Sequence, residues 1–310
     1  MAQPLFTFQS VSLPGHSRAR LQDVSGAIQR GVTAIIGFSG AGKTSLLNLL
    51  INFERSNAGS INAGEAASER LEQFWVPQND GLWPHCTVAE HLRQVDAETD
   101  PNILLQKFDL ESLADRRPEN LSRGERSRLA VARALASNAA VLIMDEPLSH
   151  VDPARELAYW QVVREHCRNN DTSLVFATHS PEQVLREAEH TICLKDGSIV
   201  YNGTVKQLYD QPESKELAEF LGACNWFDGD EWPVWFASSA SQDAGCVRPE
   251  RLLIQPSEDG MLVVLSSTFA GSVCHVTVEH VEARRQRECV YRPAVSELNA
   301  GDHVWLAVSD

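Results

Sequence analysis

The 310-residue sequence lacks several features that would each assign it to a particular class of protein. It has no apolar run of the roughly 18 to 20 residues that a helix needs to cross a bilayer. Its first residues, MAQPLFTFQS, lack the basic segment and apolar stretch of a secretory signal. Its formal net charge is -15, whereas a general nucleic-acid binder would be basic. We therefore expect a globular protein with no membrane span, no secretory leader and no nucleic-acid partner.

The seven cysteines form no C-x-x-C motif, and their number is odd. This usage is typical of reduced thiols in a cytosolic compartment and not of a disulfide framework. Core or surface thiols are favoured over a zinc site, because the adjacent Cys/His pairs lack metal-ligand spacing. These pairs are His85-Cys86, His166-Cys167 and Cys274-His275.

Two regions of different character follow each other along the chain. In the first, buried-type strands alternate with helical segments, which indicates an α/β fold with a largely parallel sheet. From Val247 onward, short strands separated by turns predict a small β-barrel or sandwich. Because 310 residues is also long for one core, we predict two domains, residues 1–222 and 223–310.

The segment GFSGAGKT matches G-x-x-x-x-G-K-[ST] between a predicted strand and a predicted helix. Glycines let the backbone wrap a phosphate, and successive N–H groups with the helix N-terminus bind the anion. Lys43 would then reach the β- and γ-phosphates, and the Thr44 hydroxyl would ligate Mg²⁺. The predicted ATP-binding residues of this loop are Gly37, Ser39, Gly40, Ala41, Gly42, Lys43, Thr44 and Ser45.

The segment VLIMDE supplies two carboxylates at the end of a second buried-type strand. Asp145 would lie at the carboxyl edge of the sheet, where it could hold the Mg²⁺ shell. Glu146, one residue further, would reach an attacking water as a general base. A third buried-type strand, SLVFA, ends at Thr178-His179.

These motifs and three others make residues 5–222 resemble the ATP-binding subunit of an ABC transporter. Gln78 occupies the position of the family's Q-loop glutamine, LSRGE that of the signature LSGGQ, and His179 that of the switch histidine. The resemblance implies a P-loop ABC ATPase domain with a helical subdomain, in which Gln78, Glu146 and His179 are catalytic and Gln78 also contacts Mg²⁺. Gln78 as a plain loop residue and His179 as a satisfied strand-end histidine remain alternatives.

The segment from Ser149 to Asp152 resembles the family's D-loop, and Asp152 could also serve only as the N-cap of the next helix. In the signature, Arg123 replaces a glycine and Glu125 replaces a glutamine. The aromatic that stacks on adenine in the family is missing, so His16 or aliphatic packing would take its place.

The signature stretch NLSRGERSRLAVARAL also predicts local structure. Ser122 and Glu125 fit an S-x-x-E capping box, so a helix is expected to begin at Arg123 with free N–H groups. By the resemblance, Ser122, Gly124 and Glu125 would contact an ATP held by a neighbouring subunit. Arg123 would either add charge beside the phosphate or point to solvent. The helix face expected to be solvated or inter-subunit carries Arg126, Arg128 and Arg133.

Two further stretches resemble importers for molybdate, sulfate, ferric ion and polyamines. LWPHCTVAEHL resembles a segment that lines a groove for a permease helix in those proteins; exposed Leu82 and Trp83 would suit such an interface, while a core-packed turn is the alternative. The tail resembles their TOBE domain, an OB-like β-rich domain that binds oxyanions or holds the dimer together. Domain packing is favoured over a ligand box for Trp226, Trp232 and Trp235.

The resemblance thus implies a transport ATPase that uses ATP and Mg²⁺ and acts as a homodimer. Its partners would be transmembrane permease subunits and, indirectly, a solute-binding protein, on the cytoplasmic face of the cell membrane. The substrate would be a small anion, a metal ion or a polyamine. The alternatives are an exporter or lipid-extracting ATPase, and a soluble ABC ATPase acting on nucleic acid or ribosomes.

Overall fold

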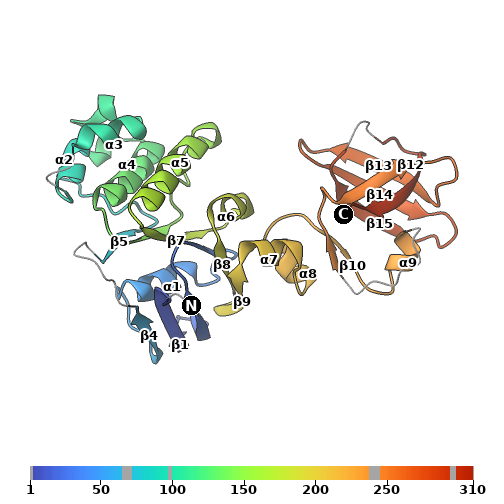
Figure 1. Cartoon of the computed structure of the whole chain (residues 1–310), viewed down its shortest axis with the longest axis horizontal. Helices are drawn as coiled ribbons and strands as arrows, with labels where there is room; N and C mark the ends of the chain where they lie inside the picture. The colour runs from blue at the N-terminus through green and yellow to red at the C-terminus, as the bar shows by residue number, and fades with distance from the viewer. Residues whose placement is uncertain (1–2, 65–71, 97–99, 237–244, 294–297, 310) are drawn as a thin grey trace. The chain divides into compact units, whose positions relative to one another are not determined.

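The computed structural model describes residues 3–64, 72–96, 100–236, 245–293 and 298–309. Its contacts divide the chain into two compact units, Met1–Val205 and Lys206–Asp310. Figure 1 shows the mixed helices and strands of the first unit and the β-rich second unit. Within the described residues, no helix is long and apolar enough to cross a membrane.

The main sheet of the first unit has the strand order β5-β6-β7-β3-β8-β9. All neighbours in it are parallel except β8 and β9, which form an antiparallel hairpin across Asp196-Gly197. Strands β6 and β7 are buried along their whole length, as the continuous apolar runs predict. The strands are β3 (Val32–Ile36), β5 (Gln73–Val76), β6 (Val141–Asp145), β7 (Ser173–Thr178), β8 (His190–Lys195) and β9 (Ser198–Thr204).

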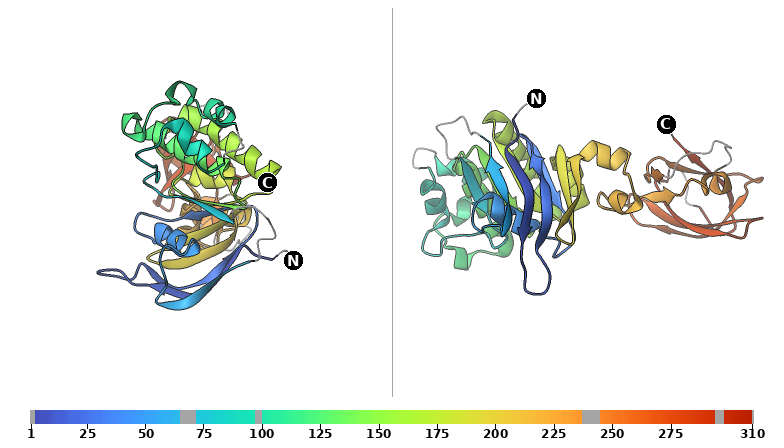
Figure 2. Two further views of the ribbon diagram at one scale, coloured as in Figure 1. Left: turned by 90° about the vertical axis from the view of Figure 1, so that its left-hand side faces the viewer. Right: turned by 90° about the horizontal axis from the view of Figure 1, so that it is seen from below.

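A second, antiparallel sheet has the order β2-β1-β4, in which β1 and β2 form a hairpin. Helix α1 lies between this sheet and the main sheet, as both views of the chain show (Figures 1 and 2). Its buried leucines join both sheets in one apolar core, in which Leu46 and Leu47 are fully buried. The elements are β1 (Phe6–Leu13), β2 (Leu21–Ile28), β4 (Ala58–Ala63) and α1 (Lys43–Leu50).

Helices α2 to α5 form the predicted helical subdomain, drawn in teal and green in Figure 1. Trp160 of α5 packs on Phe176 of β7, with ring centroids 5.1 Å apart, which fixes α5 to the main sheet. The segments 52–78 and 87–120 are shorter than the resemblance to ABC transporter subunits leads us to expect. Residues 65–71 and 97–99 within them lie outside the described residues. The helices are α2 (Val88–Arg93), α3 (Pro101–Lys107), η1 (Glu111–Leu113), η2 (Pro118–Asn120), α4 (Arg123–Ala136), α5 (Pro153–Asn169) and α6 (Pro181–Glu187).

The second unit contains an antiparallel sheet of order β12-β16-β13-β14-β15, which confirms the predicted β-rich tail. Trp232 and Trp235 are buried in its core, as expected for packing aromatics, while Trp226 is half-buried. The contacts place the division at Lys206, inside α7, and the boundary near Gly222 stays a prediction. The elements are α7 (Val205–Asp210), α8 (Lys215–Glu219), β10 (Asn225–Phe227), α9 (Trp232–Trp235), β11 (Gly245–Val247), β12 (Leu252–Pro256), β13 (Leu262–Phe269), β14 (Cys274–His280), β15 (Gln286–Tyr291) and β16 (His303–Val308).

Candidate functional site

The predicted ATP-site residues of the first unit follow four parallel strands, whose carboxyl ends meet at one edge of the main sheet. In the register, Ile36 of β3 pairs with Thr178 of β7, and Asp145 of β6 pairs with Ala177. The loops that follow β3, β5, β6 and β7 therefore leave the sheet side by side. Ligands of open α/β sheets bind at this edge.

The phosphate loop joins β3 to α1 and depends on its glycines. Gly40 and Gly42 have φ angles of +78° and +107°, which side chains other than glycine rarely adopt. A Cβ on Gly37 would lie 2.5 Å from the carbonyl oxygen of Leu194, so this position also excludes a side chain. Lys43 Nζ donates to the carbonyl oxygens of Gly37 and Phe38 at 2.7 and 3.4 Å. The ammonium group is thus held inside the curve of the loop.

Thr44 and Asp145 meet across the edge, as predicted for two Mg²⁺ ligands. Thr44 Oγ1 donates a hydrogen bond of 2.6 Å to Asp145 Oδ2. Burial raises the pKa of Asp145, the hydrogen bond from Thr44 opposes the rise, and the charge of Glu146 adds to it. A hydroxyl, a carboxylate and the nearby amide oxygen of Gln78 are oxygen donors of the kind Mg²⁺ prefers. The chemistry of this donor set fits the metal.

Glu146 lies between the other two predicted catalytic residues. Its Oε1 is 3.1 Å from His179 Nδ1, and its Oε2 accepts from Gln78 Nε2 at 3.4 Å. Glu146 has a φ of +49°, and its backbone N–H donates to the carbonyl of Ala177, so the residue leaves the strand in a strained turn. The structure therefore brings Gln78, Glu146 and His179 together, although they are far apart in the sequence.

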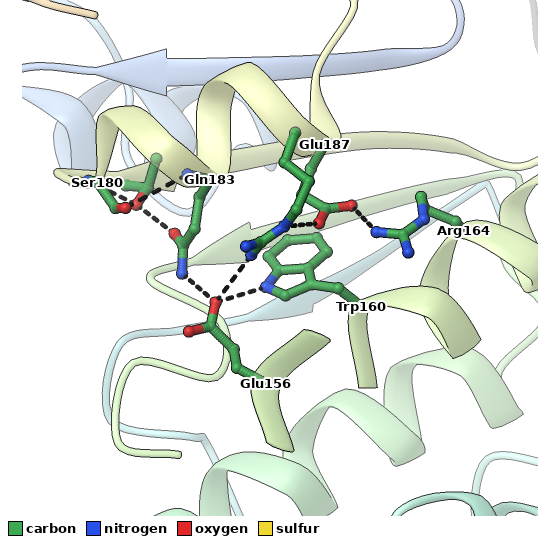
Figure 3. Close-up of polar contacts among 8 residues, drawn as sticks. Glu156, Trp160, Arg164, Ser180, Gln183 and Glu187 are labelled. Atoms are coloured by element: carbon green, nitrogen blue, oxygen red, sulfur yellow. Dashed lines mark hydrogen bonds and ion pairs between the residues drawn. The ribbon is translucent and has the colours of Figure 1, made fainter. Parts of the chain in front are cut away.

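A polar network that the sequence analysis missed connects the histidine segment to α5 (Figure 3). Thr178 Oγ1, next to His179, donates to Gln183 Oε1, and Gln183 Nε2 donates to Glu156 Oε1 at 2.7 Å. Glu156 also accepts from Trp160 Nε1 at 3.0 Å. Since Glu156 lies in the first turn of α5, Gln183 ties the loop before α6 to the start of the helix that follows Asp152.

The same network contains a buried acid held by two arginines. Glu187 has a side chain that is 1% exposed, and both Arg164 and Arg186 form ion pairs with it. Such a carboxylate is stable in the interior only with its partners in place. The sequence REAEH contains no pattern that would predict which of its two glutamates is buried.

The signature segment forms the predicted cap. Ser122 Oγ accepts from the backbone N–H of Glu125 at 3.3 Å, and Glu125 Oε2 accepts from the backbone N–H of Ser122 at 2.7 Å. Helix α4 begins at Arg123, as expected, and Arg123 is exposed. The hydrogen bond from the Ser122 backbone lowers the pKa of Glu125, so its carboxylate keeps a negative charge at the helix start.

Gly124 has a role inside its own chain that the sequence did not reveal. A Cβ at this position would lie 2.8 Å from the carbonyl oxygen of His150 in the D-loop-like segment. Asp152 caps α5 by accepting from the N–H of Ala154 at 2.9 Å, which confirms its predicted capping role. Ser122, Gly124, Glu125, His150 and Asp152 line a hollow of about 350 Å³ that does not include the phosphate loop.

The prediction of a solvated or inter-subunit arginine face on α4 is wrong for Arg133. Arg133 is 3% exposed and donates to the carbonyls of Asp80 and Gly81, because the loop after Gln78 folds onto this side of α4. Arg128 donates to the carbonyls of Phe108 and Asp109 and is half-buried. Arg126 is half-buried.

The predicted exposure of Leu82 and Trp83 is also wrong, since both are half-buried. Trp83 stacks on His91 at 5.3 Å between centroids, and the guanidinium of Arg133 lies 4.7 Å from its ring centroid. Trp83 nevertheless lines a cavity of about 900 Å³. Other residues lining this cavity are Thr44, Asn48, Phe53, Gln78, Arg133 and His150.

Two side chains, His16 and Arg18, lie in the region expected to receive adenine. His16 is exposed and lines a hollow of about 410 Å³ with Pro14, Gly15 and Arg20. Arg18, two residues on, donates to Asp196 at 2.9 Å and to the carbonyl of Gly40 in the phosphate loop at 3.3 Å. His16 as an adenine contact stays a prediction.

Comparison with known proteins shows that the phosphate loop and the strand ending at Asp145 lie in a domain shared with a known family. Residues 21–149 match the ABC transporter family model. The spermidine/putrescine import ATP-binding protein PotA of Haemophilus influenzae (strain 86-028NP) is 30% identical over 241 residues, covering 73% of this chain and 65% of that protein. The sn-glycerol-3-phosphate import ATP-binding protein UgpC of Chromobacterium violaceum is 34% identical, with 69% and 63% covered. The molybdenum import ATP-binding protein ModC of Methylococcus capsulatus is 36% identical, with 57% and 54% covered.

Solved structures of ABC transporter subunits share the fold. The ATP-binding subunit of an ABC transporter aligns with a TM-score of 0.59 at 22% identity, covering 66% of this chain and 92% of that chain. A dimeric bacterial ABC transporter cassette aligns with a TM-score of 0.57, covering 64% and 98%. The chain spans just under two thirds of the length of the PotA proteins it matches. It belongs to the ABC transporter family, in which it is related to the ATP-binding subunits of importers.

Proposed function

We propose that the chain is the ATP-hydrolysing subunit of an importer for a small anion, a metal ion or a polyamine. The observation that carries the proposal is the position of Glu146, held between Gln78 and His179 at the same sheet edge as the phosphate loop. A carboxylate in this place is suited to take a proton from a water that attacks the terminal phosphate.

The other residues of the edge bind and orient the nucleotide. Lys43 exchanges its bonds to the loop carbonyls for the β- and γ-phosphate oxygens, and the loop N–H groups hold the phosphate. His179, whose side chain is 67% exposed, turns from Glu146 to donate to the γ-phosphate. Bound Mg²⁺, held by Thr44, Asp145 and Gln78, neutralises phosphate charge.

The complete site requires a second copy of the chain. Ser122 and Gly124 line a hollow separate from the cavity that contains Thr44 and Gln78. Two copies arranged head to tail would set the start of α4 in one against the phosphate loop of the other. The exposed N-terminal turn of α4 and Arg123 then face the γ-phosphate of the partner's nucleotide.

Coupling to a permease would use the cavity beside the Gln78 loop. Phe53 on its rim is 75% exposed, and Trp83 and Phe74 supply further apolar surface. A helix of a transmembrane permease fits an apolar groove of this kind. The cavity also contains Thr44 and Gln78, so closure around ATP would change its shape. The chain would then lie on the cytoplasmic face of the membrane, and a solute-binding protein would act through the permease.

The test of the catalytic assignment is Glu146→Gln. We expect this variant to retain ATP binding, to lose roughly 100-fold or more of its turnover, and to accumulate as an ATP-bound dimer in size-exclusion chromatography. Glu165→Gln, an exposed change on α5, is the control and should hydrolyse ATP like the parent chain. Unchanged hydrolysis in Glu146→Gln would refute the assigned base.

A separate experiment tests the transport role. The chain, isolated in detergent from its native membrane fraction, should bring down a transmembrane permease and a solute-binding protein, identified by mass spectrometry. A vesicle assay with the recovered complex then measures ATP-dependent uptake of polyamine, molybdate and glycerol phosphate. Recovery of ribosomes without a permease would contradict the importer.

A further inference from the structure

Two cysteines of the second unit lie side by side. Strand β10 pairs with β11 so that Trp226 is opposite Cys246. Because side chains alternate along extended chain, Cys224, two residues before Trp226, is on the same face as Cys246 and diagonal to it. The two thiols are close enough to influence each other's pKa, which is lowered for Cys224 and raised for Cys246. The fold thus brings together two thiols that are far apart in the sequence.

This pair differs in exposure from the remaining cysteines. Cys224 and Cys246 are half-buried, whereas the other five are buried. Burial raises the pKa of Cys167, Cys193 and Cys289 to about 12, which keeps those thiols protonated and unreactive. Among the described residues of the second unit, Cys224 and Cys246 are therefore the pair of thiols that a reagent in solvent can reach. The other five cysteines are Cys86, Cys167, Cys193, Cys274 and Cys289.

A buried arginine adds positive charge next to Cys224. Arg248 follows β11 and is 3% exposed. Its guanidinium donates to the carbonyl oxygens of Ala218 and Gly222, which are neutral partners, and lies 4.2 Å from the ring centroid of Tyr209. The interaction with Cys246 lowers the pKa of the Cys224 thiol against the effect of burial, and the charge of Arg248 acts in the same direction.

We propose that Cys224 and Cys246 form a site of reversible oxidation, at which a peroxide converts the two thiols into a disulfide. The Cys224 thiolate attacks one peroxide oxygen, the O–O bond breaks, and the departing hydroxide takes up a proton to leave as water. Cys246 Sγ then attacks the resulting sulfenic sulfur, and the S–O bond breaks with loss of a second water. Two thiols lose two electrons, and one peroxide gains them.

Disulfide formation requires a movement of Cys224. A disulfide needs Cβ atoms about 3.5 to 4.5 Å apart, closer than diagonal strand neighbours usually lie. Cys224 precedes the first residue of β10 and so lies outside the β10–β11 ladder. In the proposed reaction it moves toward Cys246 while the ladder stays paired. In a reducing compartment such a bond forms transiently, as in thiols that respond to oxidants.

The experiment treats the reduced full-length chain with a few equivalents of hydrogen peroxide and follows its mass. We expect a loss of about 2 Da that dithiothreitol reverses. Trypsin leaves both cysteines in one peptide, residues 216–251, because Arg248 is followed by a proline, so cleavage after Glu231 by a glutamate-specific protease is needed to separate them. A pair of peptides joined only under non-reducing conditions then locates the bond.

Three variants test the order of events. Cys246→Ser should stop at a sulfenic acid on Cys224, which dimedone captures, so that after peroxide treatment Cys224 carries about tenfold more dimedone label than any cysteine of the buried set. Cys224→Ser should lose the 2 Da change. Cys86→Ser, at a buried position, is the control and should oxidise like the parent chain. A bond between other cysteines or between chains, or unchanged oxidation of Cys224→Ser, would overturn the proposal.

Discussion

Glu146 and His179 face each other at the end of two neighbouring strands, with Oε1 of the acid 3.1 Å from Nδ1 of the histidine. Their strands β6 and β7 pair from Val141 and Ser173 to Asp145 and Ala177, so one register shift would separate the two side chains. The distance between these residues is therefore set by the sheet, while the direction of His179 depends on the loop that follows it.

Gln183→Glu tests whether that loop is positioned by the bond between Gln183 and Glu156. The substitution replaces the Nε2 donor by a carboxylate oxygen facing Glu156 Oε1. Two facing carboxylates repel each other and raise the pKa of the pair, so the damage grows as pH rises and lessens as pH falls. We expect ATP turnover to fall about tenfold at pH 8 and to recover partly near pH 6, measured as kcat against pH.

Gln161→Glu provides a matched control for this like-charge pair. Gln161 Nε2 donates to Glu165 Oε1 at 3.0 Å on the exposed side of α5. The same new repulsion there is screened by solvent, so the pH profile of kcat should stay that of the parent chain. Identical profiles for Gln161→Glu and Gln183→Glu would show that the bond to Glu156 does not position His179.

Asp145→Asn is expected to stabilise the ligand-free chain at neutral pH while abolishing ATP turnover. Burial raises the folded-state pKa of Asp145, so the native state binds a proton more readily than the unfolded state. Stability from this group is therefore lost as pH rises from the usual aspartate value of 3.8 through the raised pKa. The penalty grows as the pH rises above the raised pKa, and asparagine removes it.

The measurement is thermal unfolding of both forms across pH. The Tm of Asp145→Asn should exceed that of the parent chain by a few degrees at pH 7, about 1 kcal/mol, and the difference should vanish near pH 4. Asp152→Asn is the control, since asparagine caps a helix as well as aspartate does. A lower Tm for Asp145→Asn at pH 7 would contradict the assigned cost of burial.

Arg133→Met tests the link between α4 and the loop after Gln78. Methionine fills a similar volume but leaves the carbonyls of Asp80 and Gly81 without their donor. Both bonds are part-buried, and an acceptor that loses its partner costs up to about 1 to 3 kcal/mol. We expect the free energy of unfolding in urea to fall by about 2 to 4 kcal/mol. Arg123→Met, at an exposed position of the same helix, should change it by less than about 0.5 kcal/mol.

Gly124→Ala should impair ATP turnover, although glycine-to-alanine changes inside helices usually stabilise by about 0.5 to 1 kcal/mol. The added Cβ would lie 2.8 Å from the His150 carbonyl, so the D-loop-like segment has to move. We expect at least tenfold lower kcat in a steady-state ATPase assay. An ATPase rate equal to that of the parent chain would show that the D-loop-like segment accommodates the added Cβ without loss of function.

Arg123→Gly at the neighbouring exposed position separates the two roles considered for Arg123. Lower ATPase activity and weaker ATP-dependent dimerisation would indicate a charge beside the partner's phosphate. Unchanged values of both would indicate a side chain that points to solvent.

The sequence by itself determined the local structure of the motifs in the first unit. The glycines of GFSGAGKT, the apolar run before Asp145 and the S-x-x-E cap act through backbone conformation and local hydrogen bonds, and each was found where it was predicted. The alternation of strands and turns likewise predicted the β-rich tail. These features depend on neighbours in the chain, so a local pattern is enough to reveal them.

Only the tertiary structure decided what the arginines of α4, Gln183 and the paired cysteines do. Arginine is usually a surface residue, yet the loop before α2 covers Arg133. Cys224 and Cys246 meet because β10 pairs with β11, a contact between segments separated by α9. Such roles depend on which distant segments fold against each other, because burial and a partner's charge change the chemistry of a side chain without changing its sequence pattern.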